Sequence, residues 1–275
     1  MTHDDASFNH LQAVVFDWAG TVIDHGCRAP ARVFQQIFES VGVPISEQQS
    51  REPMGLGKSE HIAAILAMDD VATRWREKFG QPPSDTDVQR LYADFIPLQK
   101  RVLLEHCDLI PGAAEIARTL RASGLRIGST TGYTRELLEV IASAAQEQGF
   151  TPECAVTSDD VAAGRPAPFM LFRAAELLRV YPMSTLVKVD DTAVGIRAGR
   201  NAGCWTVGVT RTGNFVGLSE TDWLGLDRAA RQERLAGAKE ALLCAGAHAI
   251  VESVADLSPV LDEFERLLAS GLSPD

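Results

Sequence analysis

A short apolar run near the start of the chain ends abruptly in a carboxylate, and this feature constrains the fold more than any other. Residues 14–16 are Val-Val-Phe, Asp17 follows them, and Gly20 and Thr21 come soon after. Such a run predicts a buried strand that delivers Asp17 to its carboxyl end, where NH groups of the next turn can face an anion. Ligands of open α/β sheets bind at such strand ends. The sequence therefore predicts an α/β fold with a site at Asp17.

The rest of the chain divides into an all-helical stretch and an alternating one. Residues from about 29 to 107 carry apolar side chains at helical spacing and contain no convincing strand. From residue 110 onward helices and strands alternate, which is typical of a parallel sheet with helices on both faces. We expect a Rossmann-like catalytic core, residues 1–25 and 108–275, with an all-helical cap domain, residues 26–107, inserted after the first strand. The later strands are expected at 125–130, 155–157, 186–189, 205–209 and 249–251, and the core helices at 112–122, 134–147, 168–179, 193–202, 227–245 and 255–269.

Composition and charge exclude several classes of protein. The hydrophobic share of 45% and the charged share of 23% are ordinary for a globular protein. A net charge of −11 argues against a nucleic-acid partner, because phosphate backbones require a basic surface. No apolar run approaches a membrane span, and the acidic, polar start is not typical of a signal peptide. The five cysteines never form a CxxC pair, which favours structural thiols in the cytoplasm over a zinc site.

Polar groups recur where the predicted strands end. Besides Asp17 these are the Thr-Thr-Gly of residues 130–132, Arg165, and the Asp-Asp-Thr of residues 190–192. Each alone has an ordinary explanation: a turn, a solvated arginine, or a helix N-cap. At corresponding ends of consecutive strands, and in an order that matches a known superfamily, they instead predict a phosphate site, with hydroxyl and NH groups at 130–132 binding the anion. A carboxylate that meets an anion there needs nearby positive charge.

The order of these groups resembles the haloacid dehalogenase (HAD) superfamily, whose members mostly transfer phosphoryl groups through an aspartyl intermediate. The resemblance implies an HAD-like fold with a C1-type cap and Asp17 as the nucleophile. It also implies Arg165 as a neutralising cation, and Mg²⁺ held by Asp17, the carbonyl of Ala19 and a further Asp.

That further Asp lies at the end of the predicted strand 186–189. The superfamily often has a Gly-Asp pair there with another acid four residues on, whereas this chain has Asp190-Asp191 and then Gly195. We prefer Asp191 as the metal ligand, and the part played by Asp190 stays open.

Ala19 is the best clue to the reaction. HAD phosphatases usually carry there a second Asp that protonates an alkoxide leaving group, an effect of about 10²–10⁴-fold. Either Asp17 is a relic, or the leaving group is not an alkoxide. The Gly-Lys-Ser around Lys58 imitates the end of a P-loop, but Glu52 replaces the required glycine and no strand precedes it, so that reading fails. Lys58 instead begins a helix and shares a face with His61.

Five segments together resemble the phosphonoacetaldehyde hydrolase (phosphonatase) family, in which a cap lysine forms a Schiff base with the substrate aldehyde. The resemblance spans about residues 11–265. It implies cleavage of the C–P bond of phosphonoacetaldehyde, in 2-aminoethylphosphonate degradation, through a Lys58 Schiff base and an Asp17 aspartyl phosphate. The imine provides an electron sink, so no acid is needed at Ala19. A homodimer, with the cap as a candidate interface, is also implied. The segments are 17–21, 53–61, 128–136, 164–166 and 201–209.

The remaining site residues follow from the same resemblance. His61 is a candidate proton shuttle or positioning group, and Cys27 lies beside the hinge, where a structural thiol is the preferred interpretation. Lys58 must be neutral to attack, so its pKa has to lie well below the ordinary value of about 10.4, and burial would achieve this. The expected substrate-binding residues are Thr131, Gly132, Arg165, Met54 and Tyr133.

Two other functions remain open. One is a generic HAD phosphatase or phosphomutase acting on small phosphate esters, against which Ala19 argues. The other is a non-catalytic protein that binds a phosphate ligand. The joint presence of Asp17, Lys58, Arg165 and Asp191 argues against that second alternative, because a non-catalytic scaffold has no reason to keep all four.

Overall fold

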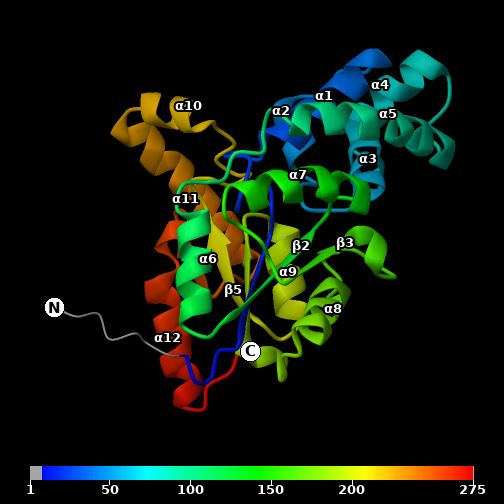
Figure 1. Ribbon diagram of the computed structural model, residues 1–275. Helices are drawn as coiled ribbons and strands as arrows, with labels where there is room; N and C mark the ends of the chain where they lie inside the picture. Colours follow the sequence, from blue (N-terminus) through cyan, green and yellow to red (C-terminus); the bar gives the residue numbers. More distant parts are fainter. Residues whose placement is uncertain (1–7, 275) are drawn as a thin grey trace.

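Six parallel strands form one sheet in the order β3-β2-β1-β4-β5-β6, in a computed structural model that describes residues 8–274 (Figure 1). The first seven residues of the predicted core segment, and with them most of the polar start, lie outside this range. The predicted α/β class with a parallel sheet is confirmed. The strands are β1 (Ala13–Phe16), β2 (Arg126–Thr131), β3 (Cys154–Thr157), β4 (Leu186–Asp190), β5 (Trp205–Val209) and β6 (Ala249–Val251).

Helices cover both faces of the sheet because successive side chains of a strand point to opposite faces. In β1, Val14 and Phe16 pack into one apolar cluster, and Ala13 and Val15 into another. The first cluster contains α6 (Ala113–Ala122), α7 (Arg135–Glu147) and α12 (Ser258–Ala269), and the second contains α8 (Phe169–Leu178) and α9 (Ala193–Asn201). Beyond α9 follow α10 (Glu220–Gly225) and α11 (Arg228–Cys244), and α11 packs on β6.

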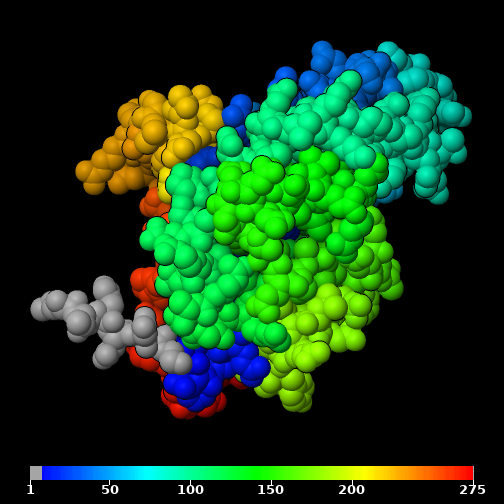
Figure 2. Space-filling model, in the orientation of Figure 1, coloured from blue at the N-terminus to red at the C-terminus, as the bar shows by residue number. Residues whose placement is uncertain are grey.

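An all-helical insertion, which we call the cap, lies between β1 and α6 at the carboxyl end of the sheet (Figure 1). Its helix α5 packs on α7 of the core, and Lys100 and Glu136 form an ion pair across this contact. Figure 2 shows the two parts seated directly against each other on this face. The exact division into two domains stays a prediction. The cap helices are α1 (Arg28–Ser40), α2 (Glu47–Arg51), α3 (Lys58–Leu66), α4 (Asp69–Phe79) and α5 (Asp85–Leu103).

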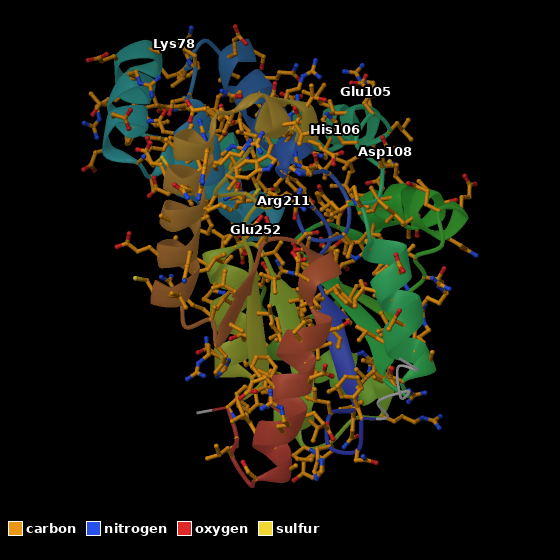
Figure 3. The ribbon with its side chains drawn as sticks, turned by 90° about the vertical axis from the view of Figure 1, so that its left-hand side faces the viewer. Lys78, Glu105, His106, Asp108, Arg211 and Glu252 are labelled. Carbon is orange, nitrogen blue, oxygen red and sulfur yellow. The ribbon has the colours of Figure 1, made fainter. Side chains whose placement is uncertain are left out.

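One buried carboxylate joins the two chain segments that connect cap and core. The side chain of Asp24 accepts hydrogen bonds from the backbone NH groups of Arg28 and Ala29, at 3.0 Å each, and so caps α1. It also lies 3.2 Å from Nδ1 of His106, on the segment that returns to the core. Figure 3 shows His106, beside Glu105, where the cap meets the core. Asp24 therefore fixes the start of the cap relative to its end.

Element boundaries differ from the sequence prediction at a few places. The last helix begins at Ser258 rather than at residue 255, because Ser253 caps a short 3-10 turn and Pro259 is tolerated only in the first turn of a helix. Strand β2 runs one residue further than expected, to Thr131, and α10 was not expected at all. All five cysteines are free thiols. Within residues 8–274, no helix combines the length and apolarity needed to cross a membrane.

Replacing Asp24 tests the connection between cap and core. Asp24→Ala removes the acceptor for two NH groups of α1, so we expect the free energy of unfolding to fall by about 1–2 kcal/mol. Asp24→Asn keeps an oxygen and suits the positive φ of 52° at this position, so it should lose less. Urea denaturation measures both. Equal midpoints for the parent and Asp24→Ala would contradict this role.

Candidate active site

The strand register brings the predicted polar groups to one level at the carboxyl end of the sheet. Phe16 of β1 pairs with Ser129 of β2 on one side and with Val189 of β4 on the other. Asp17, Thr130 and Asp190 follow these residues directly. After β1 the chain builds one side of the sheet and then crosses to the other, and this switch point is where open α/β sheets bind ligands.

A small cavity lies at this switch point, between the core and the cap. Most of the site residues that the sequence predicts line this cavity. They come from the turn after β1, the cap loop, the loop after β2 and the loop that carries Arg165. Among the described residues, His61 and Asp191 do not line it, and Cys27 does. The lining residues are Asp17, Ala19, Cys27, Pro30, Met54, Gly55, Lys58, Thr131, Gly132, Tyr133, Arg165 and Thr192.

Arg165 is the central cation of the site. One of its terminal nitrogens, Nη2, donates to Oδ1 of Asp17 at 2.6 Å and to the carbonyl oxygen of Thr130 at 2.8 Å. The other, Nη1, lies 3.3 Å from Oδ2 of Asp190. Burial raises the pKa of Asp17 above its ordinary value, and the charge of Arg165 opposes that rise. The predicted nucleophile and cation are thus in direct contact.

Lys188 is a site residue that the sequence reasoning missed. It is wholly buried in β4, and its Nζ donates to Oγ1 of Thr130 at 2.9 Å and lies 3.0 Å from Oδ2 of Asp190. Burial lowers the pKa of Lys188. A signal was present: a lysine inside the otherwise apolar run of a central strand has to pair with a buried carboxylate.

Asp191 differs from its neighbour Asp190 in the groups that contact its carboxylate. Its Oδ1 accepts from the hydroxyl of Thr21 at 3.1 Å, and its Oδ2 accepts from the backbone NH of Asn214 at 2.8 Å. Within residues 8–274, no lysine or arginine lies in ion-pair distance of it. Burial, and then the charges of Asp17 and Asp190, raise the pKa of Asp191 well above its ordinary value.

This electrostatic arrangement fits a divalent cation. Oxygens of Asp17, Asp190 and Asp191 lie within 4.8 Å of one another, and hard oxygen ligands are those that Mg²⁺ prefers. Asp190 already faces two cations, whereas Asp191 faces no lysine or arginine among residues 8–274, so Asp191 stays the expected ligand. Thr21 belongs to the motif that follows Asp17 in the sequence, whereas no sequence signal pointed to Asn214, whose NH group reaches Asp191 from a loop.

Lys58 reaches the cavity from the cap as the first residue of α3. Its Nζ lies 4.7 Å from the centre of the Tyr133 ring and 5.6 Å from that of Phe34. Burial lowers the pKa of Lys58 to about 8, even though nearby acidic groups oppose this. A substantial fraction of the amine is therefore neutral near physiological pH and able to act as a nucleophile.

His61 packs beside Lys58 rather than in the cavity wall. Its ring stacks on Phe34 at a centroid distance of 3.7 Å, and its Nε2 lies 3.0 Å from the carbonyl oxygen of Ser50. This contact assigns the proton to Nε2, which donates to that oxygen. Burial, followed by the charge of Lys58, lowers the pKa of His61 well below its ordinary value. The ring is neutral, an arrangement that suits positioning of α3.

Two glycines let the cap loop approach the core closely. A Cβ at Gly132 would lie 2.6 Å from the carbonyl oxygen of Leu56, and one at Gly55 would lie 2.5 Å from Oγ1 of Thr192. Gly55 also has a φ of +97°, which favours glycine. The loop before α3 is therefore wedged between the β2 and β4 loops, and it carries Met54 and Lys58 into the site.

Comparison with known proteins places this arrangement among hydrolases. Residues 11–203 match the haloacid dehalogenase-like hydrolase family. The chain is 44% identical to phosphonoacetaldehyde hydrolase of Paraburkholderia xenovorans (strain LB400), over 96% of this chain and 99% of that one, and 42% identical to that of Bacillus cytotoxicus, over 93% and 97%. A phosphonoacetaldehyde hydrolase like protein from Oleispira antarctica has a similar crystal structure, with a TM-score of 0.95, 39% identity, and coverage of 100% of this chain and 99% of that one.

The lowered pKa of Lys58 predicts a distinctive labelling profile. Since only the neutral amine reacts, acetylation of Lys58 by acetic anhydride should rise with pH through about 8 and then level off. An ordinary lysine keeps gaining reactivity up to about pH 10.4. Mass spectrometry of competitively labelled peptides measures both in one sample, and Lys58→Ala confirms the peptide assignment. A Lys58 profile that still climbs above pH 9.5 or so would contradict the structure.

Proposed function

We propose that this chain, which belongs to the phosphonoacetaldehyde hydrolase family of the haloacid dehalogenase-like hydrolases, hydrolyses phosphonoacetaldehyde to acetaldehyde and phosphate. One observation carries the proposal: the amine of Lys58 and the carboxylate of Asp17 line the same small cavity. An amine recognises an aldehyde and a carboxylate can attack phosphorus, so the two ends of this substrate meet the two nucleophiles.

In the first step of the proposed reaction Lys58 captures the aldehyde. The neutral amine adds to the carbonyl carbon and water leaves, which gives a protonated imine. The buried setting that lowers the pKa of Lys58 to about 8 makes the free amine available. The ring face of Tyr133, 4.7 Å from Nζ, can stabilise the positive charge of the iminium through a cation–π interaction.

Asp17 then attacks phosphorus and the carbon–phosphorus bond breaks. The electron pair of that bond moves through the adjacent carbon to the iminium nitrogen, so the departing fragment is a neutral enamine. Protonation of its carbon regenerates the imine, and water releases acetaldehyde from Lys58. A second water hydrolyses the aspartyl phosphate on Asp17 to phosphate. Because no alkoxide forms, the reaction needs no acid at Ala19, whose methyl group stands in the cavity wall.

Positive charge supports the attack from two directions. The guanidinium of Arg165 contacts Asp17 at 2.6 Å, so it can orient the carboxylate and hold phosphonate oxygens. Thr131 and Gly132, at the end of β2, offer a hydroxyl and an NH on the same wall. Asp17, Asp191 and the carbonyl of Ala19 would hold Mg²⁺, which when bound offsets charge between nucleophile and substrate.

The wider setting belongs to the same proposal. The reaction would serve 2-aminoethylphosphonate degradation in the cytoplasm, because the reducing cytoplasm keeps cysteines such as these five as free thiols. We also expect a homodimer. His61, stacked on Phe34 and bonded to Ser50, would position the helix that carries Lys58.

The substrate is tested by phosphate release. We expect Mg²⁺-dependent release from phosphonoacetaldehyde and little from a panel of small phosphate esters, because Ala19 cannot protonate an alkoxide. A colorimetric phosphate assay with and without chelator measures this. Turnover of esters alone would identify a generic phosphatase or phosphomutase, and binding without any turnover would identify a non-catalytic protein.

Two variants separate the two covalent steps. Lys58→Ala should lose both phosphate release and covalent trapping of substrate by borohydride, because no imine can form. Asp17→Asn should still be trapped while phosphate release falls by at least about 10³-fold. Intact-mass spectrometry and the phosphate assay give the two readouts. Normal turnover by Lys58→Ala would refute the Schiff-base route.

A further inference from the structure

Asp190 and Gly195 share one space although they lie on different elements. Asp190 ends β4, and Gly195 lies in the first turn of α9. A Cβ built on Gly195 would lie 2.1 Å from Cγ of Asp190 and 2.1–2.2 Å from both of its carboxylate oxygens. The carboxylate of Asp190 therefore fills the place that any side chain at residue 195 would enter.

The carboxylate of Asp190 accepts hydrogen bonds through one oxygen and faces two cations through the other. Its Oδ1 accepts from the backbone NH of Thr192 at 2.9 Å and from the hydroxyl of the same residue at 2.7 Å. Its Oδ2 lies 3.0 Å from Nζ of Lys188 and 3.3 Å from Nη1 of Arg165. Asp190 itself is not one of the residues that line the cavity.

We infer that Asp190 is the positioning residue for Arg165, and that it works because Gly195 leaves its place free. With Nη1 facing Asp190, the planar guanidinium turns its other nitrogen, Nη2, toward Asp17 and the cavity. The inference rests on the proposed function, since Arg165 is there the cation that meets the phosphonate. What the site requires is a carboxylate at this point in space, and it can come from residue 190 or from residue 195.

A reciprocal exchange of the two residues tests this inference. The exchange variant combines Asp190→Gly with Gly195→Asp, and its matched control combines Asp190→Gly with Gly195→Ala. In both variants Asp190→Gly empties the place that a side chain at residue 195 would enter. The two variants differ only in whether residue 195 carries a carboxylate. For phosphonoacetaldehyde hydrolysis we expect kcat of the control to fall by about 100-fold, because a misplaced cation costs about that much, and kcat of the exchange variant to stay within about tenfold of the parent.

A second readout distinguishes positioning from damage to the fold. Borohydride trapping at Lys58 with saturating aldehyde should match the parent in both variants, because Lys58 comes from the cap and does not contact Asp190. If the control does not fold, Asp190→Asn takes its place, since it keeps the Oδ1 bonds to Thr192 and removes the charge that faces Arg165.

The outcomes separate this inference from the proposed function. If the parent does not hydrolyse phosphonoacetaldehyde, the proposed function fails and the inference falls with it. If the parent is active, a folded exchange variant as slow as its control would overturn the inference alone. Parental kcat in the control, or in Asp190→Asn where that variant replaces it, would also overturn it. Recovery by the exchange variant, with trapping unchanged throughout, is the expected result.

Discussion

The structure depends on one electrostatic constraint: three carboxylates are buried together at the ends of two neighbouring strands. Asp17, Asp190 and Asp191 have oxygens within 4.8 Å of one another. Charges in such a place persist only when they are paired. Arg165 and Lys188 supply two positive charges, which leaves one carboxylate, Asp191, without a cationic partner in the part of the chain that the structure describes. The parallel sheet, by ending two strands side by side, creates both this problem and a place for a metal ion to relieve it.

The core has to keep buried carboxylates charged, whereas the cap has to keep a buried lysine neutral. A lysine that is to attack an aldehyde has to lose its proton, and burial lowers the pKa of Lys58 to about 8. The contact of Gly55 with Thr192 and of Gly132 with Leu56 places the loop before α3 deep between the core loops. The same closure that shields Lys58 from water therefore brings it to the cavity of Asp17. Under the proposed function, the core would keep Asp17 charged and the cap would keep Lys58 neutral.

Much of this arrangement was predictable from the sequence, and the limits have physical causes. Apolar runs ending in polar residues reveal strands and their active ends, so Asp17, Thr131, Arg165 and Asp191 could be grouped from their places after the strands and from the order they share with the HAD superfamily. Lys188 was missed because apolar periodicity treats a lysine within a strand as an interruption. The role of Asn214 had no signal, since its NH group reaches Asp191 through the path of a loop. A contact made by a backbone NH group does not depend on the type of the residue, so the sequence does not indicate it.

Asp190 and Gly195 show why sequence departures are best judged in space. Read along the chain, an extra acid and a missing side chain are two separate irregularities near the metal site. In three dimensions they are one feature, because the carboxylate of Asp190 lies where a side chain at residue 195 would project. Ala19 follows the same logic: a missing acid is a loss only when the leaving group needs a proton. Lys58 lines the same cavity, and under the proposed function a carbon leaving group would depart as an enamine, so the absent acid agrees with that chemistry.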